Sequence, residues 1–379
     1  MKRISGWAVA AALASLILAV ETAAWAERAD AATTIPCDFV VANLGALPGD
    51  YAGSASGINN AGTVVGYSIT FDPTNFDPEH PVMFQNRTVL LLHTLPSDGP
   101  PGLDFGAAVA INDQPVAVGT VFNPQGPSHA ARFVGSGTTD LGTLPFGGNS
   151  YATSINNLGE IVGYAEAVAG QNGILSHAVH YAGGAVTDLG VLPGGSYSFA
   201  ASINDQGVAV GYASTASGAF HAVRFDAGGI VDFGVPRGGA ESRALAINSQ
   251  GLAVGAADFG SGVDHAASFE PGQITDLGIL PGGTTSIATA INNSGHAVGW
   301  ADNGTGVFRP VLFAQGQVFD LGVPTGIKSA FPAAINDLDQ VVGTVNVASS
   351  PISDVQQTLA ASWTPTASCP LSVAAAQLR

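Results

Sequence analysis

The dipeptide Ile-Asn recurs seven times along this chain, and its spacing constrains the fold more than any other feature. Most of the intervals are 44 residues, with longer steps of 53 and 48 residues in the first half. A sustained period of this length is typical of a β-propeller, in which each repeat supplies one blade. The seven isoleucines are Ile58, Ile111, Ile155, Ile203, Ile247, Ile291 and Ile335.

One repeat, residues 187–229, divides into four short strands. We expect the first strand to end at residue 190 and the other three to cover residues 198–203, 208–212 and 221–225. Segments rich in Gly, Pro, Asn and Ser separate them, and no stretch shows a helical period. Four strands make one blade, so the chain is predicted to be all-β, a seven-bladed β-propeller of repeats of about 44 residues.

Small residues mark the strand that ends in each Ile-Asn pair. The third residue before the isoleucine is alanine in six repeats and Pro332 in the seventh, and the residue just before it is always Gly, Ala or Ser. We assign this strand to the innermost position, where neighbouring blades crowd the axis. A Val-Gly pair follows in every repeat. A glycine inside a strand indicates a bulge or a close backbone approach.

The recurrent asparagine has a structural explanation. The sequence Asn204-Asp205-Gln206-Gly207 is typical of a type I turn followed by a left-handed glycine, which joins the innermost strand to the next as a tight hairpin. The asparagine side chain can bond to the backbone of its own turn, so its recurrence requires no catalytic role. The seven are Asn59, Asn112, Asn156, Asn204, Asn248, Asn292 and Asn336.

The elements Asp-Leu-Gly, Leu-Pro-Gly-Gly, Ile-Asn, Val-Gly and His-Ala-x-x-Phe recur in order. With them the chain resembles the HAF-repeat family of extracellular repeat proteins, over essentially the whole chain beyond residue 26. The resemblance implies an exported repeat protein and assigns it no biochemical activity. The His-Ala pair is intact at His129, His177, His221 and His265.

Five histidines, these four and His80, share one repeat position. Equivalent positions in different blades lie far apart, so the histidines are not expected to share a metal ion. The favoured interpretation is a hydrogen bond within or between blades, for example to a recurrent aspartate. No metal site and no cofactor are predicted. The candidate aspartates are Asp140, Asp188, Asp232, Asp276 and Asp320.

The N-terminal residues have the features of a secretory signal. Lys2 and Arg3 precede an apolar run over residues 7–20, and Ala24-Trp25-Ala26 provides a cleavage site. The run is too short to span a bilayer, which takes roughly 20 residues, and no later run is longer. We therefore expect a secreted or periplasmic protein without a membrane span. The predicted divisions are a signal peptide (1–26), an N-terminal segment (27–36), the propeller (37–369) and a C-terminal tail (370–379).

The net charge of −17, from 28 acidic and 11 basic residues, excludes some partners. Such an acidic chain is not expected to bind nucleic acid or an anionic membrane surface. We expect a monomer with an extracellular glycan or protein as its ligand.

The two ends of the chain are predicted to complete one blade. Residues 39–45 align with the Asp-Leu-Gly strand, but no blade precedes them, and the last repeat supplies only three strands, within residues 330–363. Pairing the ends closes the ring and covers two exposed strand edges. This arrangement places Cys37 near Cys369, and export to an oxidising compartment lets a disulfide between them persist.

Departures from the repeat are the candidate binding loops, because scaffold positions recur while loops differ. The largest are the inserts 70–79 and 347–357, predicted to lie on the loop-rich face. The acidic first insert is interpreted as a solvated loop in preference to a Ca²⁺ site, because its spacing matches no EF-hand or repeat calcium motif. The candidate residues are Asp72, Asn75, Asp77 and Glu79 in the first repeat, and Asp258 and Asp264 in the fifth.

Two functions remain open. The favoured hypothesis is a non-catalytic binding or interaction scaffold that acts through the loop-rich face. The alternative is an extracellular glycan hydrolase or lyase with loop carboxylates as acid and base. No nucleophile elbow, zinc-protease motif or phosphate-binding loop occurs, and polar residues recur at blade period instead of forming one asymmetric cluster. No catalytic residue is therefore predicted.

Overall fold

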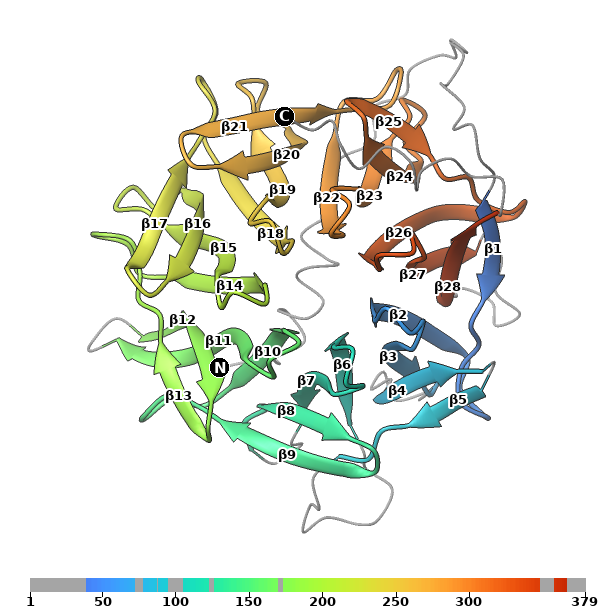
Figure 1. Ribbon diagram of the computed structural model, residues 1–379, viewed down its shortest axis with the longest axis horizontal. Helices are drawn as coiled ribbons and strands as arrows, with labels where there is room; N and C mark the ends of the chain where they lie inside the picture. The colour runs from blue at the N-terminus through green and yellow to red at the C-terminus, as the bar shows by residue number, and fades with distance from the viewer. Residues whose placement is uncertain are drawn as a thin grey trace.

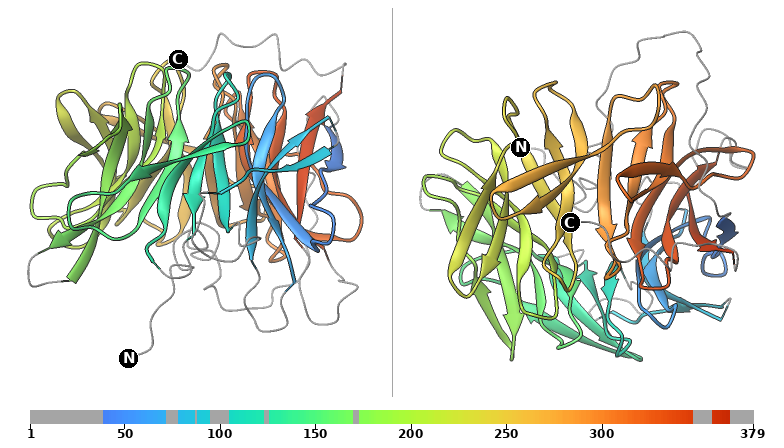
Figure 2. Two further views of the ribbon diagram at one scale, coloured as in Figure 1. Left: turned by 90° about the horizontal axis from the view of Figure 1, so that it is seen from below. Right: turned by 45° about the horizontal axis from the view of Figure 1, so that its top comes forward.

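The computed structural model describes residues 39–71, 78–86, 88–94, 105–122, 126–169, 173–347 and 358–366. The regular elements of these residues are β-strands, which form seven four-stranded antiparallel sheets. Figure 1 shows the sheets arranged as blades around a central axis, and Figure 2 shows the ring from the side. The predicted seven-bladed β-propeller is confirmed. Within the same residues, no helix is long and apolar enough to cross a membrane.

Each of the first six blades runs outward from the axis through four consecutive strands. Blades 1 to 3 contain β2 (Ala52–Ile58), β3 (Val64–Ile69), β4 (Glu79–Gln85), β5 (Thr88–Leu91); β6 (Gly106–Ile111), β7 (Ala117–Val121), β8 (His129–Val134), β9 (Gly137–Gly142); and β10 (Ser150–Ile155), β11 (Ile161–Ala169), β12 (Gly173–Ala182), β13 (Ala185–Asp188). Blades 4 to 6 contain β14 (Ser198–Ile203), β15 (Ala209–Ser214), β16 (Phe220–Asp226), β17 (Gly229–Gly234); β18 (Ser242–Ile247), β19 (Ala253–Asp258), β20 (Asp264–Glu270), β21 (Gln273–Gly278); and β22 (Ser286–Ile291), β23 (Ala297–Asp302), β24 (Phe308–Ala314), β25 (Gln317–Asp320). Blade 7 combines β26 (Ile327–Ile335), β27 (Val341–Val347) and β28 (Thr358–Pro365) with β1 (Phe39–Asn43).

The Ile-Asn strand is innermost, as predicted. In Figure 1 the first strand of each blade, such as β14 and β18, lies nearest the axis. Its recurrent alanine is fully enclosed: Ala200 and Ala244 are 1% and 0% exposed. A larger side chain there would collide with the neighbouring blade.

The recurrent Val-Gly glycine marks both a bulge and a close backbone approach. In blade 4 the register between β14 and β15 shifts between Ala200 and Ser202. Beside this bulge, a Cβ added to Gly211 would lie 1.7 Å from the carbonyl oxygen of Phe199. The corresponding distance is 2.2 Å or less in every blade, so only glycine fits at this position.

A buried aromatic side chain on the third strand anchors each blade. All seven are at most 4% exposed, and they lie in hydrophobic clusters that join adjacent blades. Burying a side chain of this size contributes about 2–3 kcal/mol. The core therefore consists of layers between blades, with no single centre. The residues are Phe84, Phe133, Tyr181, Phe225, Phe269, Phe313 and Trp363.

The ring closes through the N-terminal strand, as predicted. Strand β1 pairs antiparallel with β28, and Val41 lies opposite Trp363. The indole Nε1 of Trp363 also donates a hydrogen bond to the carbonyl oxygen of Gly322 at 3.1 Å, which ties the last blade to its neighbour. Cys37 and Cys369 lie outside the described residues, as do the leader and both terminal segments, so the disulfide stays a prediction.

In blades 2 to 5 the recurrent histidines pair with the recurrent aspartates of the same blade, whereas in blade 1 the imidazole Nε2 of His80 lies 3.1 Å from the hydroxyl of Thr70. The imidazole Nδ1 of His177 lies 2.8 Å from Asp188, and equivalent pairs at 2.8–3.0 Å occur in blades 2, 4 and 5. In blade 6, Arg309 replaces the histidine and donates to Asp320 through Nε at 2.8 Å. The structural interpretation of the histidines is confirmed, because each pair ties its third strand to its fourth.

Candidate functional site at the axis

The seven recurrent asparagines form a closed ring of hydrogen bonds around the axis. In each, Oδ1 accepts a backbone N–H of its own turn, as in the bond from Val208 to Asn204 at 3.0 Å. This is the role that the sequence predicts. The amide Nδ2 in addition donates to the carbonyl oxygen of the asparagine in the next blade, as from Asn204 to Asn248 at 3.1 Å. This bond joins each blade to the next at 3.0–3.2 Å, and the bond from Asn336 to Asn59 closes the circle.

The residue after each of these asparagines forms a second, more exposed layer, which we call the axial ring. In six of the seven, the backbone N–H donates to a side-chain oxygen of the next blade at 2.7–2.9 Å. The seventh, the N–H of Asp205, has no acceptor among the described residues, because the short Ser249 follows it in the ring. The members are Asn60, Asp113, Asn157, Asp205, Ser249, Asn293 and Asp337.

Amides and carboxylates alternate around the axial ring. Asn60 Nδ2, for example, donates to both Asp113 and Asp337 at 3.1 Å. Alternation gives each carboxylate an amide neighbour and keeps negative charges apart. A ring of seven cannot alternate throughout, and Ser249 occupies the one position where the pattern fails.

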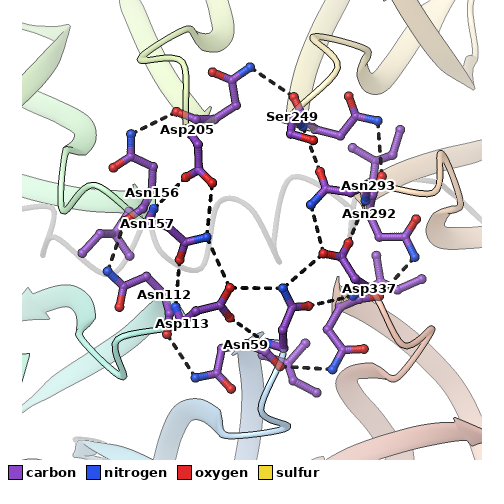
Figure 3. Close-up of a pocket in the computed structure, with 18 of the residues that line it drawn as sticks. Asn59, Asn112, Asp113, Asn156, Asn157, Asp205, Ser249, Asn292, Asn293 and Asp337 are labelled. Atoms are coloured by element: carbon purple, nitrogen blue, oxygen red, sulfur yellow. Dashed lines mark hydrogen bonds between the residues drawn. The ribbon is translucent and has the colours of Figure 1, made fainter.

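The axial ring surrounds a pocket of about 180 Å³. Figure 3 shows the labelled side chains of Asp113, Asp205 and Asp337 around its open centre. These three carboxylates are its charged lining groups, and no lysine, arginine or histidine of the described residues lines it. No group of three potential ligands in the described part of the chain is placed to hold a metal ion. The pocket therefore suits a ligand rich in hydrogen-bond donors or carrying positive charge.

The sequence interpretation missed this pocket, although its signal was present. An acid or amide follows Ile-Asn in six of the seven repeats, and serine follows in the remaining one. The hairpins between first and second strands bring these residues together at one end of the axis. The predicted loop-rich face lies at the other end, because the strands of each blade are antiparallel.

On the loop-rich face, Glu79 is the one residue of the first predicted group that the structure describes. Asp72, Asn75 and Asp77 lie outside the described residues, as does most of the insert after Val347. Glu79 begins β4 opposite Ile69, and burial raises the pKa of its carboxyl to about 7.

Replacing Glu79 with glutamine is expected to flatten the pH dependence of stability. In the folded chain the Glu79 carboxyl keeps its proton up to about pH 7, whereas in the unfolded chain the carboxyl loses its proton near its ordinary pKa of 4.5. The carboxyl therefore contributes stability that is complete below pH 4.5 and lost as the pH rises through 7. The shift corresponds to at most about 3 kcal/mol, and partial exposure reduces our expectation to about 1–2 kcal/mol.

Urea unfolding at pH 4 and pH 8 measures this effect of Glu79→Gln. The variant should gain stability over the natural protein at pH 8 and match it at pH 4. The exposed Glu270→Gln serves as the control and should show no such difference. An equal response to pH in the Glu79 variant and the natural protein would contradict the assignment.

In the fifth blade the two predicted carboxylates lie opposite each other, Asp258 on β19 and Asp264 on β20. Hydrogen bonds from the N–H groups of Gly262 and Gly260 hold the pKa of Asp258 below its usual range, and this side chain orders its own loop. Burial raises the pKa of Asp264, against the effect of Arg243, whose Nη1 lies 3.5 Å away. Both carboxylates thus have structural partners.

No family model matches the chain, and no curated protein matches it. Solved structures similar to it include an acylaminoacyl peptidase from Pyrococcus horikoshii (10% identity, TM-score 0.45, 81% of this chain and 51% of that one). The chain thus spans about half the length of that peptidase. A second is the β-propeller domain of the Trilobed protease from Pyrococcus furiosus, with 11% identity and a TM-score of 0.40 over 73% of this chain and 97% of that one. A third is a gluconolactonase from Xanthomonas campestris, with 12% identity and a TM-score of 0.38 over 90% of this chain and 99% of that one.

Proposed function

We propose that the protein is an exported, non-catalytic binding scaffold that holds its ligand in the axial pocket. The leader and the HAF-repeat resemblance support export. The observation that carries the proposal is a pocket of about 180 Å³ that, among the described residues, takes its charged lining groups from three carboxylates. Loops of the other face stay a second candidate surface.

The state of the carboxylates supports binding over catalysis. Glycoside hydrolysis needs two carboxyl groups about 5–10 Å apart, one of them a free general acid. In the axial ring, each carboxylate accepts hydrogen bonds from a neighbouring amide and a backbone N–H. Those bonds hold each carboxylate in place as a hydrogen-bond acceptor, a role that suits a binding group better than a free general acid.

A serine-to-arginine pair of variants tests which face binds. Ser249→Arg places a guanidinium beside Asp205 and is expected to fill the pocket and offset one of its three negative charges. Ser217→Arg makes the same change in an exposed loop of the other face. Both proteins are probed with a glycan array and a peptide array, and the natural protein's hits should weaken at least tenfold in Ser249→Arg only.

Three results would contradict the proposal. Loss of binding in Ser217→Arg alone would assign the site to the loop-rich face. Unchanged binding in both variants would exclude the axial pocket. Release of reducing ends from a bound glycan, lost in a loop carboxylate variant, would favour the hydrolase hypothesis.

A further inference from the structure

One carboxylate of the axial ring has more free acceptor capacity than the other two. Asp113 and Asp337 each accept three hydrogen bonds within the ring. Asp205 accepts two, both from Asn157. An ionised carboxylate offers about four acceptor sites, so Asp205 is the least saturated. Its neighbour Ser249 adds a hydroxyl oxygen that makes no hydrogen bond to the described residues.

The pocket also has an electrostatic preference. Its three carboxylates are not offset by a basic lining residue among the described ones, and the whole chain carries a net charge of −17. A concave site lined by one sign of charge attracts the opposite sign. The least saturated carboxylate, Asp205, is where a cationic group gains most.

Two exposed leucines are the chain neighbours of residues that line the pocket. Leu158 and Leu338 directly follow the ring residues Asn157 and Asp337, and they are 72% and 62% exposed. Both occupy the same turn position, in blades 3 and 7. Large apolar side chains held beside a polar pocket are typical of a protein-binding surface, with a polar centre and apolar contacts around it.

Resting on the proposed function, we infer that the axial pocket binds a lysine or arginine side chain presented on an apolar segment of a partner protein. The ammonium or guanidinium group contacts Asp205 and Ser249, and apolar neighbours of that side chain contact Leu158 and Leu338. A peptide carbonyl can also accept the unused N–H of Asp205. A free polyamine offers neither the carbonyl nor the apolar contacts.

Capped heptapeptides test the inference with a defined probe. Their central residue is Lys, Arg, Gln or Glu, their flanking residues are Leu or Ser, and affinity is measured by fluorescence anisotropy at 50 and 500 mM salt. Lys and Arg peptides with leucine flanks should bind at least tenfold more tightly than the Gln peptide, and their affinity should be lower at 500 mM salt than at 50 mM.

Two groups of variants identify the contacts. Asp205→Asn should weaken the binding of the Lys and Arg peptides about tenfold and leave the binding of the Gln peptide unchanged. Glu270→Gln removes a charge outside the pocket and should leave the affinity for all of these peptides unchanged. Leu158→Ser with Leu338→Ser should remove the advantage of leucine flanks. Thermal unfolding confirms that each variant is folded.

The outcomes separate this inference from the proposed function. Equal binding of Lys and Gln peptides would overturn the inference, as would spermidine binding more tightly than any peptide. A neutral glycan that binds, and is lost in Ser249→Arg while no peptide binds, would overturn the inference and keep the proposed function. If neither Ser249→Arg nor Asp205→Asn alters the binding of any probe, the inference and the proposed function are both wrong.

Discussion

Replacing Gly211 with alanine is expected to destabilise the propeller by about 4 kcal/mol, the largest effect of any change considered for this chain. The new Cβ would lie 1.7 Å from the carbonyl oxygen of Phe199 and 2.8 Å from its carbonyl carbon. Both atoms belong to the backbone of β14, so no side-chain rotation relieves the collision. The strands would have to separate next to the bulge, which breaks ladder hydrogen bonds in the crowded inner part of the blade.

Equilibrium unfolding in urea measures this loss, and Gly137→Ala is the matched control. Gly137 also lies in a strand, at the outer edge of blade 2, where the nearest atom to an added Cβ is the Val134 carbonyl oxygen at 3.5 Å. That contact is an ordinary one, so the control should stay within about 0.5 kcal/mol of the natural protein. A Gly211 variant as stable as the control would mean that the two strands can separate at little cost.

Replacing Asn204 with alanine is expected to cost about 2–4 kcal/mol. Its side chain is 6% exposed and makes three hydrogen bonds. Oδ1 accepts the N–H groups of Gln206 and Val208, and Nδ2 donates to the Asn248 carbonyl oxygen. Removing the side chain leaves the N–H groups of Gln206 and Val208 without their acceptor and takes one of the two hydrogen bonds from the Asn248 carbonyl oxygen, which keeps the bond from Gly251. An unsatisfied buried group costs about 1–3 kcal/mol.

Gln206→Ala is the control for this prediction, because Gln206 lies in the same turn with an exposed side chain. It should change stability by less than about 0.5 kcal/mol. Urea unfolding of both variants is compared with that of the natural protein. If the two variants lose equal stability, the ring of asparagines contributes nothing beyond the turn itself.

The sequence by itself determined the number of blades, the order of strands within them and the way the ring closes. These features depend on local patterns, which one repeat displays and the others reinforce. Small residues such as Ala200 mark the innermost strand, Gly211 marks the bulge beside it, and a strand without a blade near Phe39 indicates closure at the end of the chain. Pairing of His177 with Asp188 was also predictable, because both lie on adjacent strands of one repeat.

Only the tertiary structure decided which atoms meet between blades. Asn204 and Asn248 are 44 residues apart, and this spacing does not predict that the side-chain amide of Asn204 reaches the backbone carbonyl of Asn248. That contact exists because seven equal blades around one axis bring the same turn position to the centre. Closure also turns the residues after Ile-Asn into neighbours, so that Asp113, Asp205 and Asp337 surround one pocket and an odd-numbered ring leaves Ser249 where alternation fails.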